Sequence, residues 1–433
     1  MAYSGANVLN QNIQKLTRRY IVLFSIQNFL FLFSSTFLIL FLGDSVGLAT
    51  AGFLISVSLL AQGLLDFPMG VLSDTIGQKY VLFASWVFGS LAYVYIYFDN
   101  SFETLILFMI FLGVQRALFS GTFETWYDNN YKELILEQDN QRIQYSYIFT
   151  RVQTFSRTFS AFGFLIGGYI AFYYSRQLSF LIQGILGLIF AIVVLFTMND
   201  YVKMRIEESE TSFLDMFFTK IKEGVKFFIS SKKIFFFILT LVFVQVMWTV
   251  WSSLLLFIMY FGYTGSDDLA GTFRTVIFFT GIPMGLLASS LSKKVKNLIW
   301  LPVLFLLQPL FFFGLFTIIT FVIPMTNTLN FDGLLAVWLV FTLITALFQI
   351  GQIMFQRLLI EFIPNEIRNS IYSLVPTIVS IVSFPFLVVA GYLIENVHFS
   401  AGILFNGSIG IISALCILIV YLLGREELRK VKL

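Results

Sequence analysis

Residues 70–79 read Gly-Val-Leu-Ser-Asp-Thr-Ile-Gly-Gln-Lys and join the second and third of a series of long apolar runs. Gly77 can take a positive φ in a tight turn, where most other residues are strained. Gly70 permits close helix packing, and Asp74 can offer its charge to an adjacent helix N-terminus. Lys79 adds a positive charge at the end of the stretch. The pattern predicts a short, charged turn between two helices.

A degenerate copy of this stretch lies in the second half of the chain. Residues 285–294 read Gly-Leu-Leu-Ala-Ser-Ser-Leu-Ser-Lys-Lys, which keeps the first glycine and the final lysine but loses the aspartate. The two first glycines, Gly70 and Gly285, are 215 residues apart. A shared signature at equivalent points of two halves indicates an internal duplication.

The chain around these stretches is too apolar for an ordinary soluble domain. Hydrophobic residues make up 58% of its 433 residues, the mean hydropathy is +0.87, and only 12% of residues are charged. Soluble proteins carry about 25% charged residues, and roughly 20 apolar residues span a bilayer. The runs predict twelve membrane-spanning helices at 20–42, 47–73, 79–98, 103–125, 144–173, 178–199, 234–261, 270–290, 298–323, 333–358, 369–394 and 399–424.

Charge alternates between the loops that join these runs. Lys and Arg gather near the N-terminus, in every second loop and in the C-terminal tail, whereas Asp and Glu gather in the remaining loops. Positive loops mark the cytoplasmic side of a membrane protein. We therefore expect an integral membrane protein with both termini in the cytoplasm.

The longest polar segment divides the chain. Residues 200–233 carry seven Lys or Arg, and the apolar residues between 214 and 228 follow helical spacing. This pattern predicts an amphipathic helix on the inner membrane surface. The expected organisation is a six-helix bundle at 1–199, a cytoplasmic linker at 200–233 and a second six-helix bundle at 234–433.

Taken together, these motifs resemble those of the major facilitator superfamily. The turn at 70–79 is similar to its loop signature, although Thr75 and Gln78 replace basic residues. Residues 116–128, which place Arg116 before Ser-Gly and an acidic residue, resemble its fourth helix. Residues 364–370 resemble the start of its eleventh helix.

The resemblance implies an all-α fold of 12 transmembrane helices in two pseudo-symmetric six-helix bundles. It also implies a secondary active transporter that works by alternating access in the cell membrane, and it leaves the substrate open. Residues 163–168, Gly-Phe-Leu-Ile-Gly-Gly, are similar to a motif of the superfamily's proton antiporters, with Phe164 in place of a proline. These glycines can instead serve close helix packing.

Ionisable residues inside predicted spans are costly in a bilayer and are therefore candidates for function. Asp66 and Glu124 are the candidate proton-coupling residues. Arg116 and Arg157 are candidates for contact with substrate. Glu124 can instead form a structural salt bridge with Arg151. The set expected to act as a conformational gate is Gly70, Asp74, Gly77, Lys79 and Arg151.

Uncharged polar and aromatic residues also lie midway in several spans. The resemblance implies that spans one, four, seven and ten line a central cavity. The further candidates for that cavity are Gln27, Asn28, Gln245, Trp248 and Gln349. Any one of these side chains can instead hydrogen-bond between helices.

Two transport functions are compatible with these residues. The first is proton-coupled export of small amphipathic compounds, and the alternative is transport of an organic anion or another small solute by symport or uniport. The chain has one histidine and one cysteine, so no catalytic or metal-binding cluster of these residues is expected, and the protein is not expected to be an enzyme. Neither a cofactor nor nucleic acid is expected to bind, no nucleotide-binding motif is present, and a monomer suffices for this architecture.

Overall fold

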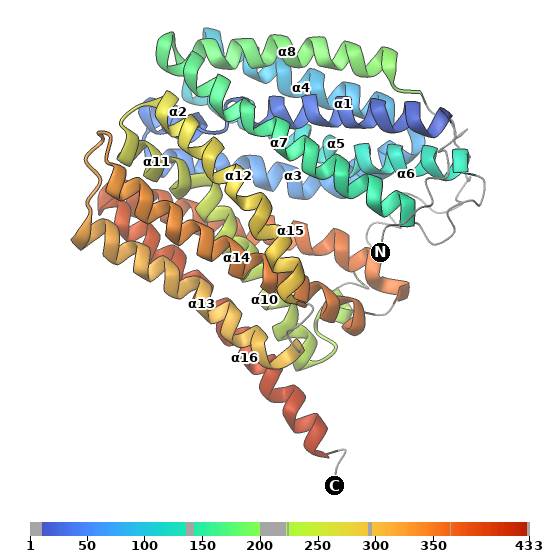
Figure 1. Ribbon diagram of the computed structural model, residues 1–433, viewed down its shortest axis with the longest axis vertical. Coiled ribbons are helices and arrows are strands. Elements are labelled where there is room, and N and C mark those ends of the chain that lie inside the picture. The colour runs from blue at the N-terminus through green and yellow to red at the C-terminus, as the bar shows by residue number, and fades with distance from the viewer. Residues whose placement is uncertain are drawn as a thin grey trace. The chain divides into compact units, whose positions relative to one another are not determined.

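The computed structural model describes residues 11–135, 143–199, 222, 225–292, 297–363 and 365–430. Regular secondary structure in these ranges is entirely helical (Figure 1). This agrees with the all-α prediction. Most of the predicted linker helix at 214–228 lies outside the described residues.

The helices form two compact units that do not follow chain order strictly. The first unit comprises Met1–Ser35 and Leu64–Glu208, and the second comprises Thr36–Gly63 and Ser209–Leu433. One long helix, α3 (Leu48–Ile76), therefore contributes its first half to the second unit and its second half to the first. The predicted division at 1–199, 200–233 and 234–433 stays a prediction.

The first unit is built around three helices, α1, α4 and α8, that lie side by side (Figure 1). Helix α7 packs along α1, and helix α5 packs along α4. Besides the second half of α3, its helices are α1 (Gln11–Phe33), α4 (Gln78–Phe98), α5 (Phe102–Phe119), α6 (Thr122–Ile135), α7 (Ile143–Tyr173) and α8 (Arg176–Thr197).

In the second unit, helix α16 packs against both α10 and α13, and helix α14 packs against α12 and α13. Besides the first half of α3, its elements are α2 (Leu38–Val46), α10 (Lys232–Val250), η1 (Trp251–Leu255), α11 (Leu256–Thr264), α12 (Asp267–Ser292), α13 (Asn297–Thr317), η2 (Ile318–Val322), α14 (Phe331–Phe362), α15 (Asn365–Asn396) and α16 (Phe399–Lys430).

Ten stretches within the described residues are long and apolar enough to cross a membrane. They are Gln11–Val46, Leu48–Asp66, Gln78–Phe98, Phe102–Leu134, Arg176–Thr197, Lys232–Thr264, Trp300–Val322, Phe331–Gln356, Leu374–Asn396 and Phe399–Gly424. The predicted fifth and eighth spans correspond to α7 and α12, which are not among the ten. The prediction of a protein with several membrane-spanning helices is confirmed, and the count of twelve spans stays a prediction.

Two spans predicted as single helices are interrupted. A turn at 34–37 separates α1 from α2, and residues 120–121 separate α5 from α6. The seventh predicted span instead continues from α10 through the π-helical segment η1 into α11. Shifted by the 215-residue spacing of the two signature glycines, the turn at 34–37 corresponds to 249–252, where η1 begins. π-Helical segments inside α-helices are frequent at functional sites.

The first half of α3 is held along helix α15 within the second unit. At one end, the Ala49 amide donates to a carboxylate oxygen of Glu395 at 2.6 Å. The start of a helix favours a negative charge at this place. At the other end, the Thr377 hydroxyl donates to the Gly63 carbonyl at 3.0 Å. Helix α15 therefore contacts α3 from the first turn of α3 to Gly63, the last residue of α3 that belongs to this unit.

Candidate functional site

The interruption of the fourth predicted span creates two helix ends inside an apolar segment. Helix α5 ends at Phe119, and helix α6 begins at Thr122. Between them Gly121 has φ +69°, in the left-handed region that favours glycine. The Thr122 hydroxyl donates to the Leu118 carbonyl at 2.8 Å and so satisfies one of the groups that the break frees.

These helix ends match the two charges of the segment. Arg116 lies in the last turn of α5, and Glu124 lies in the first turn of α6. The C-terminal end of a helix carries partial negative charge and the N-terminal end partial positive charge, each worth about 0.3–1 kcal/mol to a complementary side chain. The break therefore lowers the cost of both charges without requiring them to pair with each other.

Arg116 is half-buried, and the Tyr93 side chain on α4 lies near it. The Tyr93 hydroxyl in turn lies near Ser34 and Gln183. The amide nitrogen of Gln183 donates to the Leu30 carbonyl at 2.8 Å, near the end of α1. The sequence analysis did not single out Tyr93 or Gln183.

Aromatic rings flank the same place. Phe119 follows Arg116 by three residues on α5, so the two side chains share a helix face. The ring of Phe119 lies 4.9 Å from that of Phe31 on α1, which in turn lies 5.2 Å from Trp86 on α4. Phe31 and Phe119 are half-buried, whereas Trp86 is buried. A cationic group and a partly exposed aromatic pair are thus adjacent in the first unit.

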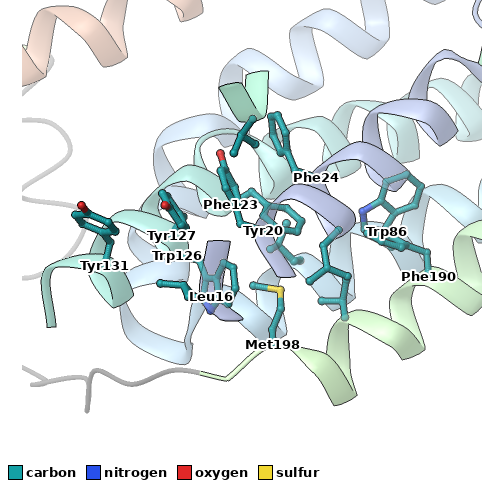
Figure 2. Packing of buried hydrophobic residues seen from close by; sticks show 14 of the residues in the cluster. Leu16, Tyr20, Phe24, Trp86, Phe123, Trp126, Tyr127, Tyr131, Phe190 and Met198 are labelled. Carbon is teal, nitrogen blue, oxygen red and sulfur yellow. The ribbon is translucent and has the colours of Figure 1, made fainter. Parts of the chain in front are cut away.

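Glu124 has a different setting, beside a buried aromatic cluster. Tyr20 on α1 stacks on Tyr127 of α6 with ring centroids 4.3 Å apart and lies 6.0 Å from Phe123 (Figure 2). Glu124 interacts electrostatically with Tyr20. The Tyr127 hydroxyl lies 3.1 Å from that of Thr17, one turn before Tyr20 on α1. Because these rings stack closely, the cluster serves to pack α1 against α6.

Asp66 lies in the interior of α3, far from both ends of the helix. Its side chain is half-buried, and its Oδ1 atom is buried without a hydrogen-bond partner in the described part of the chain. It stands three residues after Gly63, where α3 leaves the second unit. No helix end offsets its charge, in contrast to Glu124.

The cavity candidates of the first span make contacts within the first unit. Gln27 is fully buried, and its Oε1 accepts from the Trp86 indole at 3.3 Å. The amide nitrogen of Asn28 donates to the Phe24 carbonyl at 2.7 Å and to the Ser156 hydroxyl at 3.0 Å. Both side chains thus connect helices, the alternative that the sequence left open, and their role in a cavity stays a prediction.

The cavity candidates of the second unit are all half-buried: Gln245, Trp248 and Gln349. The Trp248 indole donates to Gln308 on α13 at 3.4 Å, and its ring lies 4.3 Å from Phe348 on α14. The sequence analysis did not single out Gln308. Gln349 on α14 approaches the signature glycine of the second half, because a Cβ atom on Gly285 would lie 2.8 Å from its Oε1.

In the described residues, no group of three or more His, Cys, Asp or Glu side chains could hold a metal ion. The charged residues of the site are instead Asp66, Arg116 and Glu124, one on each of α3, α5 and α6. A set of single charges on separate helices inside apolar segments is typical of ion and substrate pathways.

A family model described as Major Facilitator Superfamily matches residues 20–385. The chain belongs to the Major Facilitator Superfamily. A comparison with curated protein sequences gave no match.

Solved structures of other transporters share this superfamily fold. The nucleoside transporter NupG superposes with a TM-score of 0.71 at 12% identity over 95% of this chain and 99% of its own. The POT family transporter PepTSo gives 0.68 at 10% identity over 94% and 97%. The D-xylose-proton symporter gives 0.66 at 15% identity over 94% and 97%. Identities this low establish the fold and leave the substrate open.

The superfamily's turn signature is seen in part. The positive φ predicted for Gly77 is confirmed at +105°, and Gly77 directly precedes helix α4. In the described part of the chain no atom lies within 4 Å of the place where a Cβ on Gly70 would stand, so close packing at Gly70 stays a prediction. The Lys79 ammonium lies 5.6 Å from the Tyr80 ring. The Asp74 side chain lies outside the described residues.

The remaining arginine candidates of this superfamily member lie on α7. Arg151 and Arg157 both have exposed side chains, whereas Glu124 is half-buried. The salt bridge between Glu124 and Arg151 therefore stays a prediction, as do the gating role of Arg151 and the substrate contact of Arg157.

Outside the spans, Asp99 fixes the start of α5. Its carboxylate accepts hydrogen bonds from the Thr104 hydroxyl at 2.5 Å and from the Ser101 amide at 3.0 Å. These bonds favour the charged form and lower the pKa of the Asp99 carboxyl. Helix α5 is thus held at its first turn by a side-chain cap and ended by the left-handed residue Gly121.

Replacing Gly121 with alanine tests the break in span four. A left-handed conformation costs a residue with a Cβ about 1–2 kcal/mol, so G121A should destabilise the protein by about that amount. The expected readout is a thermal midpoint lower by about 2–6 °C in detergent. G281A is the control, since Gly281 has no positive φ and no atom within 4 Å of a Cβ. Equal midpoints for the two variants would contradict the left-handed break.

Proposed function

We propose that this member of the superfamily is a secondary active transporter that exports small amphipathic compounds in exchange for protons. Twelve spans, cytoplasmic termini and two six-helix halves at 1–199 and 234–433 form the proposed architecture in the cell membrane. Family membership supports transport of a small molecule across a bilayer. The turn at 34–37 and the π-helical segment η1 lie at corresponding points of the two halves, which supports the internal repeat typical of transporters.

The setting of Asp66 carries the proposal of proton coupling. A charged carboxylate in the interior of a membrane-spanning helix is costly, and binding a proton removes that cost. One of its oxygens is buried without a hydrogen-bond partner in the described residues. The helix that carries Asp66 contributes to both compact units. A change of charge at Asp66 therefore acts on a helix that is part of both units.

Glu124 is the second proton-coupling candidate, and its setting is less favourable for that role. The N-terminal end of α6 stabilises its negative charge, so the charged form has compensation that Asp66 lacks. Glu124 is then suited to a structural role at the start of α6, beside the buried aromatic cluster of α1 and α6. We assign proton binding first to Asp66.

The alternative is transport of an organic anion or another small solute by symport or uniport. Structures with this fold include a nucleoside transporter, a POT family transporter and a D-xylose-proton symporter, so the fold permits several substrates and directions. The observation that favours an anion is Arg116, a cation inside an apolar segment whose neighbours are polar but uncharged.

The test is transport by the purified protein in sealed vesicles under an imposed proton gradient. Lipophilic cations, neutral amphiphiles and aromatic carboxylates are added in turn, and dissipation of the gradient is recorded. Dissipation driven by one class of amphiphile and absent from empty vesicles is the expected result. If no amphiphile dissipates the gradient while labelled solute still equilibrates across the membrane, proton coupling is wrong and uniport takes its place.

A further inference from the structure

We infer that the substrate carries an anionic group, bound by Arg116, next to a flat apolar part that contacts Phe31 and Phe119. This inference rests on the proposed transport function and names the substrate class for it. It also joins the two functional alternatives, since an aromatic carboxylate is both amphipathic and an organic anion.

The charge of Arg116 needs an anionic partner that the described residues do not supply. An ionised guanidinium inside an apolar segment is stable only when it is paired or faces water. In the described part of the chain no carboxylate forms an ion pair with Arg116, and its electrostatic partner is the hydroxyl of Tyr93. The C-terminal end of α5 offsets only part of the charge. A planar carboxylate can accept two hydrogen bonds from the guanidinium.

The hydroxyl groups beside Arg116 fit the same ligand. Ser34 is 1% exposed and stands in the turn that ends α1. Its hydroxyl lies within hydrogen-bonding reach of the Tyr93 hydroxyl, which lies near Arg116. When one of two paired hydroxyls donates to the other, the second O–H is left to donate to a ligand acceptor. The Ser34 and Tyr93 hydroxyls thus offer a donor near the cation.

The aromatic pair, Phe31 and Phe119, indicates the chemistry of the other half of the ligand. Phe119 lies on the same face of α5 as Arg116, three residues later. The rings of Phe119 and Phe31 contact each other with centroids 4.9 Å apart, and both remain half-buried. A cation followed by an aromatic pair matches a ligand with a charged end and a flat apolar body.

The experiment measures equilibrium binding of naphthalene-2-carboxylate and of its neutral isostere naphthalene-2-carboxamide to the purified full-length protein in detergent. The expected result is at least about tenfold tighter binding of the carboxylate, the range of a hydrogen bond to a charged group. In R116Q the preference should fall to within about twofold, and R116K should keep part of it. R176Q, at the start of α8, is the control that removes an arginine elsewhere and should keep the preference.

Equal affinities for carboxylate and carboxamide in the unsubstituted protein overturn the inference, as does absence of binding of either probe. So does an R116Q variant that melts like the unsubstituted protein and keeps the preference. F31A should weaken the binding of both probes by the same factor of about ten, because stacking contacts act on the ring and not on the charge. Binding needs no gradient, so a protein that prefers the carboxylate but moves no protons would refute the coupling proposal alone.

Discussion

Replacing Gly167 with valine is expected to destabilise the protein by more than about 3 kcal/mol, the upper range for overpacking. A Cβ atom on Gly167 would overlap the carbonyl oxygen of Phe33, and one on Gly163 would lie 2.5 Å from the carbonyl oxygen of Phe29. Both obstacles are backbone atoms of α1, so a change of rotamer cannot relieve them. Helices α1 and α7 would have to separate along their contact.

The measurement is the thermal midpoint of the purified variant in detergent, where a loss of this size lowers the midpoint by about 6 °C or more. The matched control is G314V on α13, because no atom of the described residues lies within 4 Å of a Cβ on Gly314. It should stay within about 1 kcal/mol of the unsubstituted protein. A G167V midpoint equal to that of G314V would show that α1 and α7 do not pack as seen here. Such packing is also a sufficient reason for the glycines of 163–168, apart from any antiport role.

Sequence reasoning located most of the helices because bilayer-length apolar runs and the charges between them are long-range signals. It missed the interruptions at 34–37 and 120–121 and the π-helical segment at 251–255. Small polar residues such as Ser34 and Ser120 occur in continuous helices as well as in breaks. Whether the backbone leaves the helix depends on neighbours that only the tertiary structure supplies.

The candidate site, too, could be predicted from sequence only in part. Arg116 and Glu124 could be found from sequence, because a charge in an apolar run is unusual by itself. Their position at two helix ends could not be found from sequence, since it depends on the break between α5 and α6. Tyr93 and Gln183 carry no distinctive signal inside their runs. Gln27 had the signal of a cavity residue, yet its side chain is buried against Trp86.

Asp66→Asn is expected to reduce proton-coupled transport about 10- to 100-fold, the range of typical coupling free energies between two sites. Asparagine has nearly the same shape but cannot take up or release the proton. The vesicle assay should therefore show loss of gradient dissipation, while equilibrium binding of substrate to D66N stays within about threefold of the unsubstituted protein. The thermal midpoint should not fall, because the neutral amide removes the cost of a buried charge.

Two carboxylates on helix α6 make this prediction specific. Glu124→Gln should keep coupling and instead lower the thermal midpoint, since it removes a negative charge that the N-terminal end of α6 stabilises. Glu133→Gln, exposed at the far end of α6, should change neither property. If E124Q loses coupling and D66N keeps it, the proton-binding role belongs to Glu124. The partial positive charge at the N-terminal end of α6 would then favour release of the proton from Glu124. Asp66, in the interior of α3, would have a structural role.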